Sequence, residues 1–164
     1  MRPIGEAGYI LTVNELYILA GLTGAEVITG IDMKCACEDQ EQVTAILEKA
    51  KTGLLQKKYV REHNDILKVD QNLFYLVKTC CQPVAIIRLS YIRSGNRCHR
   101  LYYFSKDVIV ELEGVNHIHD VYILTPIISE QKLVHNMEEC LFTEGHDWIE
   151  NKMFKMPIGA LHRL

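Results

Sequence analysis

The stretch between residues 70 and 104 constrains the fold more than any other, because it carries a helix, a stop and a hairpin in succession. Asp70 is a favourable N-cap, since its carboxylate accepts hydrogen bonds from the free N–H groups of a first helical turn. Apolar residues then recur at helical spacing until Pro83. The strand-like segments VAIIRLSYIR and RCHRLYYF follow, joined by the turn Ser94-Gly95-Asn96. This order of elements occurs in DNA-binding winged helices and in protein-interaction scaffolds.

Further helices are predicted before this unit. Thr12 and Glu15 have the spacing of a capping box and begin the first helix. Residues 38–52 carry an apolar stripe, acidic residues in the first turn and Gly53 at the expected C′ position, which predicts a second helix. Two short strands are expected at residues 59–60 and 66–67, on either side of a turn.

The β-rich part continues beyond the hairpin. Segments 107–113 and 117–125 extend it to a four-stranded antiparallel meander over about 84–125, and Pro126 ends the sheet. Ser129 caps a last helix, and residues 146–154 add a further turn or two. The prediction is an α+β fold in one compact domain, 1–164, with three parts. These are a helical part of winged-helix character (about 10–82), the meander (about 84–125) and C-terminal helices (about 129–155).

Charge is unevenly distributed along the chain. Between residues 51 and 106 there are eleven Lys and Arg against three Asp and Glu, whereas the remainder holds seven basic and eighteen acidic residues. A basic middle between acidic ends predicts a surface with two poles. Such a surface can meet nucleic acid or an acidic protein, or it can fold against the chain's own acidic half.

The cysteines and histidines predict neither disulfides nor a metal site. Hydrophobic residues make up 48% of the chain and charged residues 24%, as in a globular protein. The N-terminal apolar run is interrupted by polar residues, so neither a signal peptide nor a membrane span is expected, and the predicted location is cytoplasmic. Thiols stay reduced there. His117 and His119 share one face of a strand, but no second pair with ligand spacing completes a set. The six cysteines are Cys35, Cys37, Cys80, Cys81, Cys98 and Cys140.

No motif with reaction chemistry is present, so the chain is not expected to be an enzyme or to hold a cofactor. There is neither a phosphate-binding glycine loop nor a Gly-x-Ser-x-Gly elbow. A triad of Cys98, His99 and Asp120 can be written down, but adjacent strand residues point to opposite faces.

A winged-helix DNA-binding regulator is one hypothesis. Arg93 and Arg97 flank the tip of the hairpin, where a wing would enter a minor groove. The helix that would read bases begins with acidic Asp70 and carries only Lys78 as a basic residue, with Gln71 and Asn72 as polar readers. Charge alone would give non-specific, salt-sensitive affinity.

A second hypothesis comes from a resemblance. The segments ILTVNELYILA (10–20) and GAEVITGI (24–31), the Leu67–Leu76 stretch and the Cys81-Gln82-Pro83 break resemble EspG-like proteins over about residues 9–125. These are cytosolic chaperones and accessory factors of type VII secretion systems. The resemblance implies a non-catalytic protein that holds a secreted substrate or a component of the secretion machine. Members of the family commonly have a second, related half, so the resemblance transfers no contact residues.

The hairpin suits such a role. It would offer backbone groups and aromatic side chains to a partner, and its arginines would steer an acidic one. For the tyrosines the alternative is core packing with the hydroxyl at the surface. The residues predicted to bind a partner are Arg88, Tyr91, Arg93, Arg97, Arg100 and Tyr102.

Overall fold

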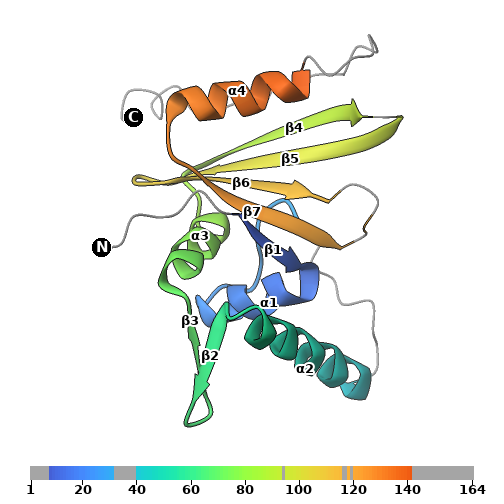
Figure 1. Ribbon diagram of the computed structural model, residues 1–164, viewed down its shortest axis with the longest axis vertical. Helices are drawn as coiled ribbons and strands as arrows, with labels where there is room; N and C mark the ends of the chain where they lie inside the picture. Colours follow the sequence, from blue (N-terminus) through green and yellow to red (C-terminus); the bar gives the residue numbers. More distant parts are fainter. Residues whose placement is uncertain (1–7, 32–39, 94, 116–117, 119, 142–164) are drawn as a thin grey trace.

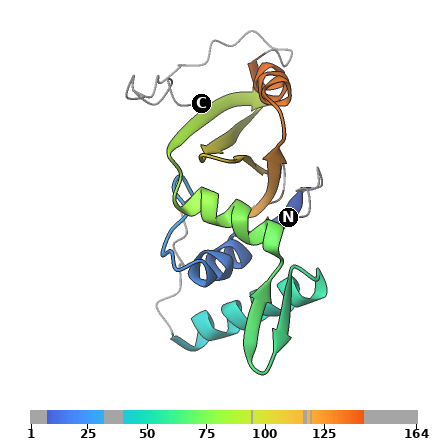
Figure 2. The ribbon, with the colours of Figure 1, turned by 90° about the vertical axis from the view of Figure 1, so that its left-hand side faces the viewer.

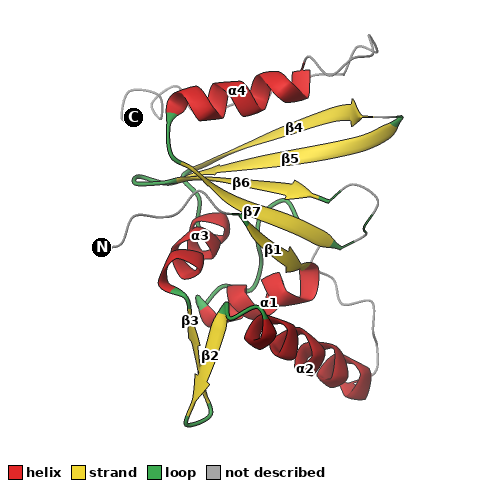
Figure 3. Ribbon diagram, viewed as in Figure 1, coloured by secondary structure: helices red, strands yellow, loops and turns green. Residues whose placement is uncertain are grey.

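The computed structural model describes residues 8–31, 40–93, 95–115, 118 and 120–141, and its fold is α+β (Figures 1 and 3). Three helices and three short strands are interspersed in the first half of the described chain, and strands dominate the second half. In order, the elements are β1 (Tyr9–Thr12), α1 (Val13–Leu22), α2 (Gln40–Gln56), β2 (Val60–His63), β3 (Ile66–Val69), α3 (Gln71–Cys81), β4 (Ala85–Arg93), β5 (Asn96–Phe104), β6 (Ile109–Gly114), β7 (Val121–Ile127) and α4 (Glu130–Leu141).

The predicted helix starts are confirmed by their caps. The backbone N–H of Glu15 donates to Thr12 Oγ1 at 3.2 Å, and the N–H of Thr12 donates to Glu15 Oε2 at 2.7 Å, which completes the capping box of α1. Asp70 Oδ1 accepts from the N–H groups of Asn72 and Leu73, both at 3.1 Å, and so caps α3. Both caps satisfy donors that helix geometry leaves free.

The predicted end of the second helix is wrong. Gly53 does not follow the helix but lies inside α2, which continues to Gln56. A Cβ at this position would lie 2.6 Å from Oε1 of Glu15 in α1. A side chain at position 53 would obstruct the close approach of α1 and α2. The glycine is therefore explained by this approach and not by a helix cap.

The short hairpin predicted after α2 is confirmed. Val60–His63 pairs antiparallel with Ile66–Val69, and Asn64 and Asp65 turn the chain with φ values of 50° and 60°. Asparagine and aspartate tolerate this left-handed conformation better than most residues. In Figure 2 this hairpin and α2 lie at the opposite end of the molecule from α4.

The main sheet has five strands in the order β1-β7-β6-β5-β4, all antiparallel. The predicted four-stranded meander is therefore not confirmed, because β1 adds a fifth strand beside β7, with Leu11 opposite Tyr122. The predicted winged-helix character is not confirmed either, since the β4–β5 hairpin is continuous with this sheet. The sequence gives no hint of the β1–β7 pairing, which joins residues at opposite ends of the described chain.

One face of the sheet packs against α1 and α3 and forms the main core. Side chains alternate along β5, so Leu101 and Tyr103 point into this core while Cys98 and Arg100 lie on the face toward α4. Tyr103 is fully buried and donates its hydroxyl to the carbonyl of Thr29 at 2.8 Å. The helices contribute Leu16, Leu19 and Ala20 from α1 and Leu73, Leu76, Val77 and Cys80 from α3.

α4 begins where Ser129 caps it, as predicted: the N–H of Lys132 donates to Ser129 Oγ at 3.1 Å. Of the helices in the described part of the chain, none is both long and apolar enough to cross a membrane. The helical turns predicted over 146–154 lie outside the described residues.

Candidate partner-binding surfaces

The six residues predicted to bind a partner all lie on β4 and β5, but the fold divides them into an exposed group and a buried group. The exposed group is Arg88, Arg93 and Arg97. The buried group is Tyr91, Arg100 and Tyr102, whose exposed fractions are 3%, 6% and 0%. The second group lies beneath α4 and offers no surface to a partner while α4 is in place.

Two of the exposed arginines, Arg88 and Arg97, contribute to a basic face on the side of the hairpin away from α4. In the β4–β5 register Ser90 lies opposite His99, and Ile92 opposite Arg97, while Arg88 is two residues before Ser90. These five residues therefore share one side of the sheet. We call Arg88, Ser90, Ile92, Arg97 and His99 the basic face. Ile92 is 47% exposed, so the face also offers an apolar contact.

The pKa of His99 depends in part on the charge of the basic face. Its Nδ1 lies 2.9 Å from Ser90 Oγ. Partial burial lowers the pKa of His99 below its ordinary value, and the charges of Arg88 and Arg97 lower it further. Both guanidinium groups are thus close enough to act on the same imidazole.

We therefore predict that Arg88→Gln/Arg97→Gln raises the pKa of His99 toward its ordinary value of about 6.5. Removing two neighbouring positive charges makes protonation of the imidazole easier. The pKa is measured by NMR titration of the His99 ring protons. Arg93→Gln is the matched control, because Arg93 lies on the opposite side of β4 and should leave the titration unchanged. An unchanged pKa in the double variant would contradict the proximity of the two arginines to His99.

The three exposed arginines form no ion pair with any described residue. Other basic residues do: Lys51 pairs with Glu62 at 2.6 Å and Lys57 with Glu15 at 2.7 Å. The basic middle of the chain is therefore only partly neutralised by acidic residues within the part of the chain that the structure describes.

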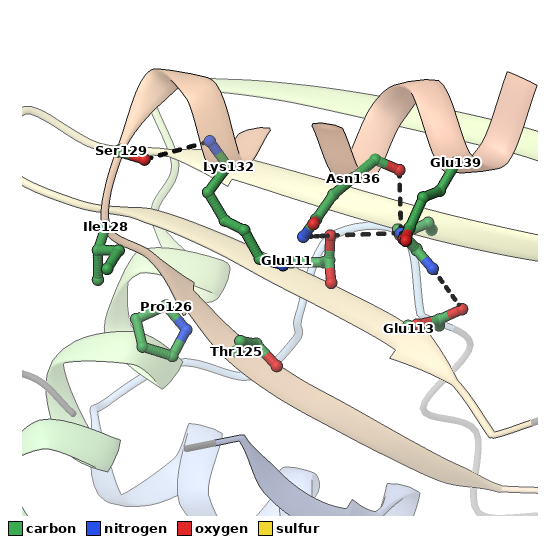
Figure 4. Close-up of a pocket in the computed structure, with 10 residues that line it drawn as sticks. Glu111, Glu113, Thr125, Pro126, Ile128, Ser129, Lys132, Asn136 and Glu139 are labelled. Carbon is green, nitrogen blue, oxygen red and sulfur yellow. Dashed lines mark hydrogen bonds and ion pairs between the residues drawn. The ribbon is translucent and has the colours of Figure 1, made fainter. Parts of the chain in front are cut away.

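Arg100 is the centre of a buried polar cluster between the sheet and α4, and Figure 4 shows its neighbours Glu111, Glu113 and Asn136. Its Nη2 donates to Glu113 Oε1 at 2.8 Å, and its Nη1 donates to the carbonyl of Asn136 in α4 at 3.0 Å. Nη1 also lies 3.7 Å from Glu111 Oε2. Burial alone would lower the pKa of Arg100, but the hydrogen bond to Glu113 and the charge of Glu111 outweigh it and raise the pKa.

Tyr91 and Asn136 complete this cluster. The Tyr91 hydroxyl donates to Glu113 Oε1 at 2.8 Å, and Asn136 Nδ2 donates to Glu111 Oε2 at 2.8 Å. Burial and the bond to Glu113 raise the pKa of Tyr91 well above its ordinary range. We call Tyr91, Arg100, Glu111, Glu113 and Asn136 the polar cluster.

A pocket of about 580 Å³ opens beside the polar cluster, between α4 and strands β6 and β7. Its lining includes Arg100, Glu111, Glu113 and Asn136, with Lys132 and Glu139 contributed by α4. The pocket contains no Cys, and its Ser129 is engaged as the cap of α4.

The other chemistry considered from the sequence gains no site in the described part of the chain. No group of three or more His, Cys, Asp or Glu side chains there is placed to hold a metal ion. Cys98 and His99 lie on opposite faces of β5, one toward α4 and the other on the basic face. Cys80 and Cys81 are free thiols. Cys35, Cys37, His117 and His119 lie outside the described residues.

Sequence reasoning missed Glu111, Glu113 and Asn136. The two glutamates alternate with the buried residues Val110 and Leu112 along β6, which places both carboxylates on one face of the strand. This alternation was a usable indication of a polar face. The sequence around Asn136 carries no comparable indication, because its partner Glu111 is 25 residues away in sequence.

Comparison with known proteins adds no family to this description. No protein-family model matches the chain, and neither does any curated protein at a significant level.

Proposed function

We propose that this chain is a non-catalytic protein-binding factor that takes an acidic protein partner on the basic face of its β4–β5 hairpin. In this role it would act like the EspG-like chaperones and accessory factors of type VII secretion that its sequence resembles. The observation that carries the proposal is the pair of exposed arginines on the basic face, Arg88 and Arg97, which form no ion pair with the described residues.

The chemistry of the basic face fits carboxylates. Guanidinium groups bind carboxylates through two parallel hydrogen bonds, and their charge steers an acidic partner toward the surface. Exposed apolar side chains add buried area on association: Ile92 is 47% exposed and Val84, just before β4, is 73% exposed. β4 is also an edge strand of the sheet.

A winged-helix DNA-binding regulator is the alternative. It is favoured by Arg93 and Arg97 at the two ends of the hairpin turn. The helix that would read bases, α3, is turned into the core through Leu73, Leu76 and Val77, and its exposed side includes Gln71 and Lys78. That side could contact DNA phosphates, but it has few groups for base edges.

The test is affinity capture with the full chain as bait, in a lysate of the source cells at low and physiological salt. We expect a captured protein of acidic composition that is lost when the bait carries Arg88→Glu/Arg97→Glu. Arg61→Glu is the control, because Arg61 is an exposed residue of β2, remote from the β4–β5 hairpin. If both variants retain the captured protein equally, its binding does not depend on the basic face, and the proposal is contradicted.

Binding to a random-sequence DNA duplex distinguishes the DNA-binding alternative from the protein-binding proposal. The regulator hypothesis predicts binding at low salt that persists in part at physiological salt and falls in Arg93→Ala/Arg97→Ala. The protein-binding proposal predicts loss of DNA binding between these two salt concentrations. Persistent, arginine-dependent binding to DNA would replace the first proposal with the second.

A further inference from the structure

We propose that the sheet face beneath α4 is a second docking surface, for an amphipathic helix of a partner protein, and that α4 is its displaceable occupant. The existence of a natural partner rests on the proposed function. The displacement of α4 does not, because it is a property of this chain alone.

α4 is held to the sheet by few apolar contacts. Its buried residues are Asn136 and Cys140, Leu133 and Met137 are half-buried, and Val134 and Leu141 are 52% and 54% exposed. Within the described residues, the apolar cluster that includes Cys140 comprises Tyr91 and Cys98, with the half-buried Leu89 packed against it. By contrast, α3 buries Leu73, Leu76, Val77 and Cys80 in the main core. Because hydrophobic stabilisation scales with the apolar area removed from water, α4 is held much less firmly than α3.

The remaining described attachment of α4 is polar: it includes Asn136, an ion pair of 4.0 Å between Arg100 and Glu139, and a hydrogen bond between Tyr91 and Cys140. Asn136 accepts from Arg100 through its carbonyl and donates to Glu111 through its amide. Bonds within the sheet do not depend on α4: Arg100 and Tyr91 both donate to Glu113, which lies on β6. The sheet face therefore stays assembled when α4 leaves, and water can replace the two bonds to Asn136.

The fit of α4 over the cluster is also incomplete. Among the described residues, Nε of Arg100 and the hydroxyl of Tyr102 are buried without a hydrogen-bond partner. The pocket of about 580 Å³ lies beside the same helix. A buried polar group without a partner loses its hydration and gains nothing in return, so covering these atoms weakens the hold of α4.

The occupant that suits this surface is a helix, because the surface already accommodates a 12-residue one. β7 ends at Ile127 and α4 begins at Glu130, so Ile128 and Ser129 form a short connection about which the helix can swing. Without α4, the face presents the guanidinium of Arg100 with the carboxylates of Glu111 and Glu113. This charge favours a partner helix that carries amide or basic side chains on its inner side, as α4 carries Asn136 and Lys132 along the pocket (Figure 4).

Native cysteines provide the test. Cys98 and Cys140 are 8% and 2% exposed and lie between α4 and the sheet, while Cys80 is 1% exposed in the core on the other face. The full chain is treated with iodoacetamide under native conditions, and modification at each cysteine is followed by mass spectrometry. We expect Cys98 and Cys140 to react at least tenfold faster than Cys80, because α4 opens without global unfolding. One common rate for all three cysteines would overturn the proposal.

Asn136→Ala sharpens this test. The variant should speed modification of Cys98 severalfold and leave the rate at Cys80 unchanged. Glu138→Ala is the matched control, since Glu138 is an exposed residue of the same helix. Equal acceleration at Cys98 and Cys80 would show that the variant loosens the whole fold, and the separate opening of α4 would be refuted.

A labelled peptide of residues 129–141 then tests whether the uncovered face accepts a helix in trans. Its apparent affinity for the full chain should rise in Asn136→Ala by the same factor as the Cys98 rate, because both depend on the open fraction. Failure of the peptide to bind either chain would refute the docking surface. Neither readout involves the basic face or a natural partner, so these results are independent of the capture experiment.

Discussion

Arg100→Met is expected to reduce the free energy of unfolding by about 3–5 kcal/mol, because it leaves the buried Glu111 and the half-buried Glu113 without their cation. Arg100 is 6% exposed and donates to Glu113 at 2.8 Å, so water cannot fully take its place. Methionine fills a similar volume, which separates the loss of charge from the loss of packing. The measurement is urea denaturation followed by circular dichroism.

Two further variants isolate the electrostatic cause. Arg93→Met removes an exposed arginine from the same hairpin and should change stability by less than about 0.5 kcal/mol. Adding Glu111→Gln and Glu113→Gln to Arg100→Met removes the uncompensated charges and should restore part of the loss. Equal stability of Arg100→Met and wild type would mean that Arg100 does not hold the two carboxylates in the folded protein.

Gly53→Ala is expected to destabilise the fold by about 1–3 kcal/mol, although this exchange ordinarily stabilises a helix interior by about 1 kcal/mol. The new Cβ would lie 2.6 Å from Glu15 Oε1. Glu15 is 3% exposed and accepts from Lys57 Nζ at 2.7 Å and from the Thr12 N–H at 2.7 Å. Its carboxylate cannot move aside without breaking these bonds. Stability is again measured by urea denaturation.

Two controls separate the clash with Glu15 from the general effect of replacing glycine by alanine in a helix. Gly21 lies in α1 with no atom within 4 Å of an added Cβ, so Gly21→Ala should show the ordinary stabilisation. In a Glu15→Ala background the clash is absent, and Gly53→Ala should become neutral or stabilising. Destabilisation of the same size in both backgrounds would show that Glu15 is not the cause.

Features set by neighbouring residues were predictable from the sequence. The capping box of Thr12 and Glu15, the Asp70 cap and the β4–β5 hairpin each depend on residues only a few positions apart, and all three are confirmed. The α+β class follows from the same local patterns, because periodicity distinguishes helix from strand.

Features set by distant contacts were not predictable in this way. β1 pairs with β7, with Tyr9 opposite Leu124, and nothing local to Tyr9 indicates that partner. The burial of Arg100 depends on α4, whose Asn136 is 36 residues away. Gly53 resembled a helix end because the carboxylate of Glu15 that excludes a Cβ is invisible to local reasoning.

The same limit explains the division of the candidate site. The sequence-based prediction assigns six residues of one hairpin to one surface, although alternation places Arg88 and Tyr91 on opposite faces of β4. Sequence alone does not show which of these faces another element covers. The register places Arg88 and Arg97 on the open side, and α4 covers Tyr91 and Arg100 on the other. One basic surface thus becomes an exposed basic face and an enclosed polar cluster.

The most direct test of the central claim is the pKa of His99 measured by NMR with and without the captured acidic protein. Carboxylates placed against Arg88 and Arg97 would offset the positive charges that lower this pKa. The account predicts that the pKa of His99 rises on binding, and that Arg88→Glu/Arg97→Glu abolishes both the binding and the rise. Binding that leaves the His99 titration unchanged would contradict the assignment of the basic face as the site of the partner.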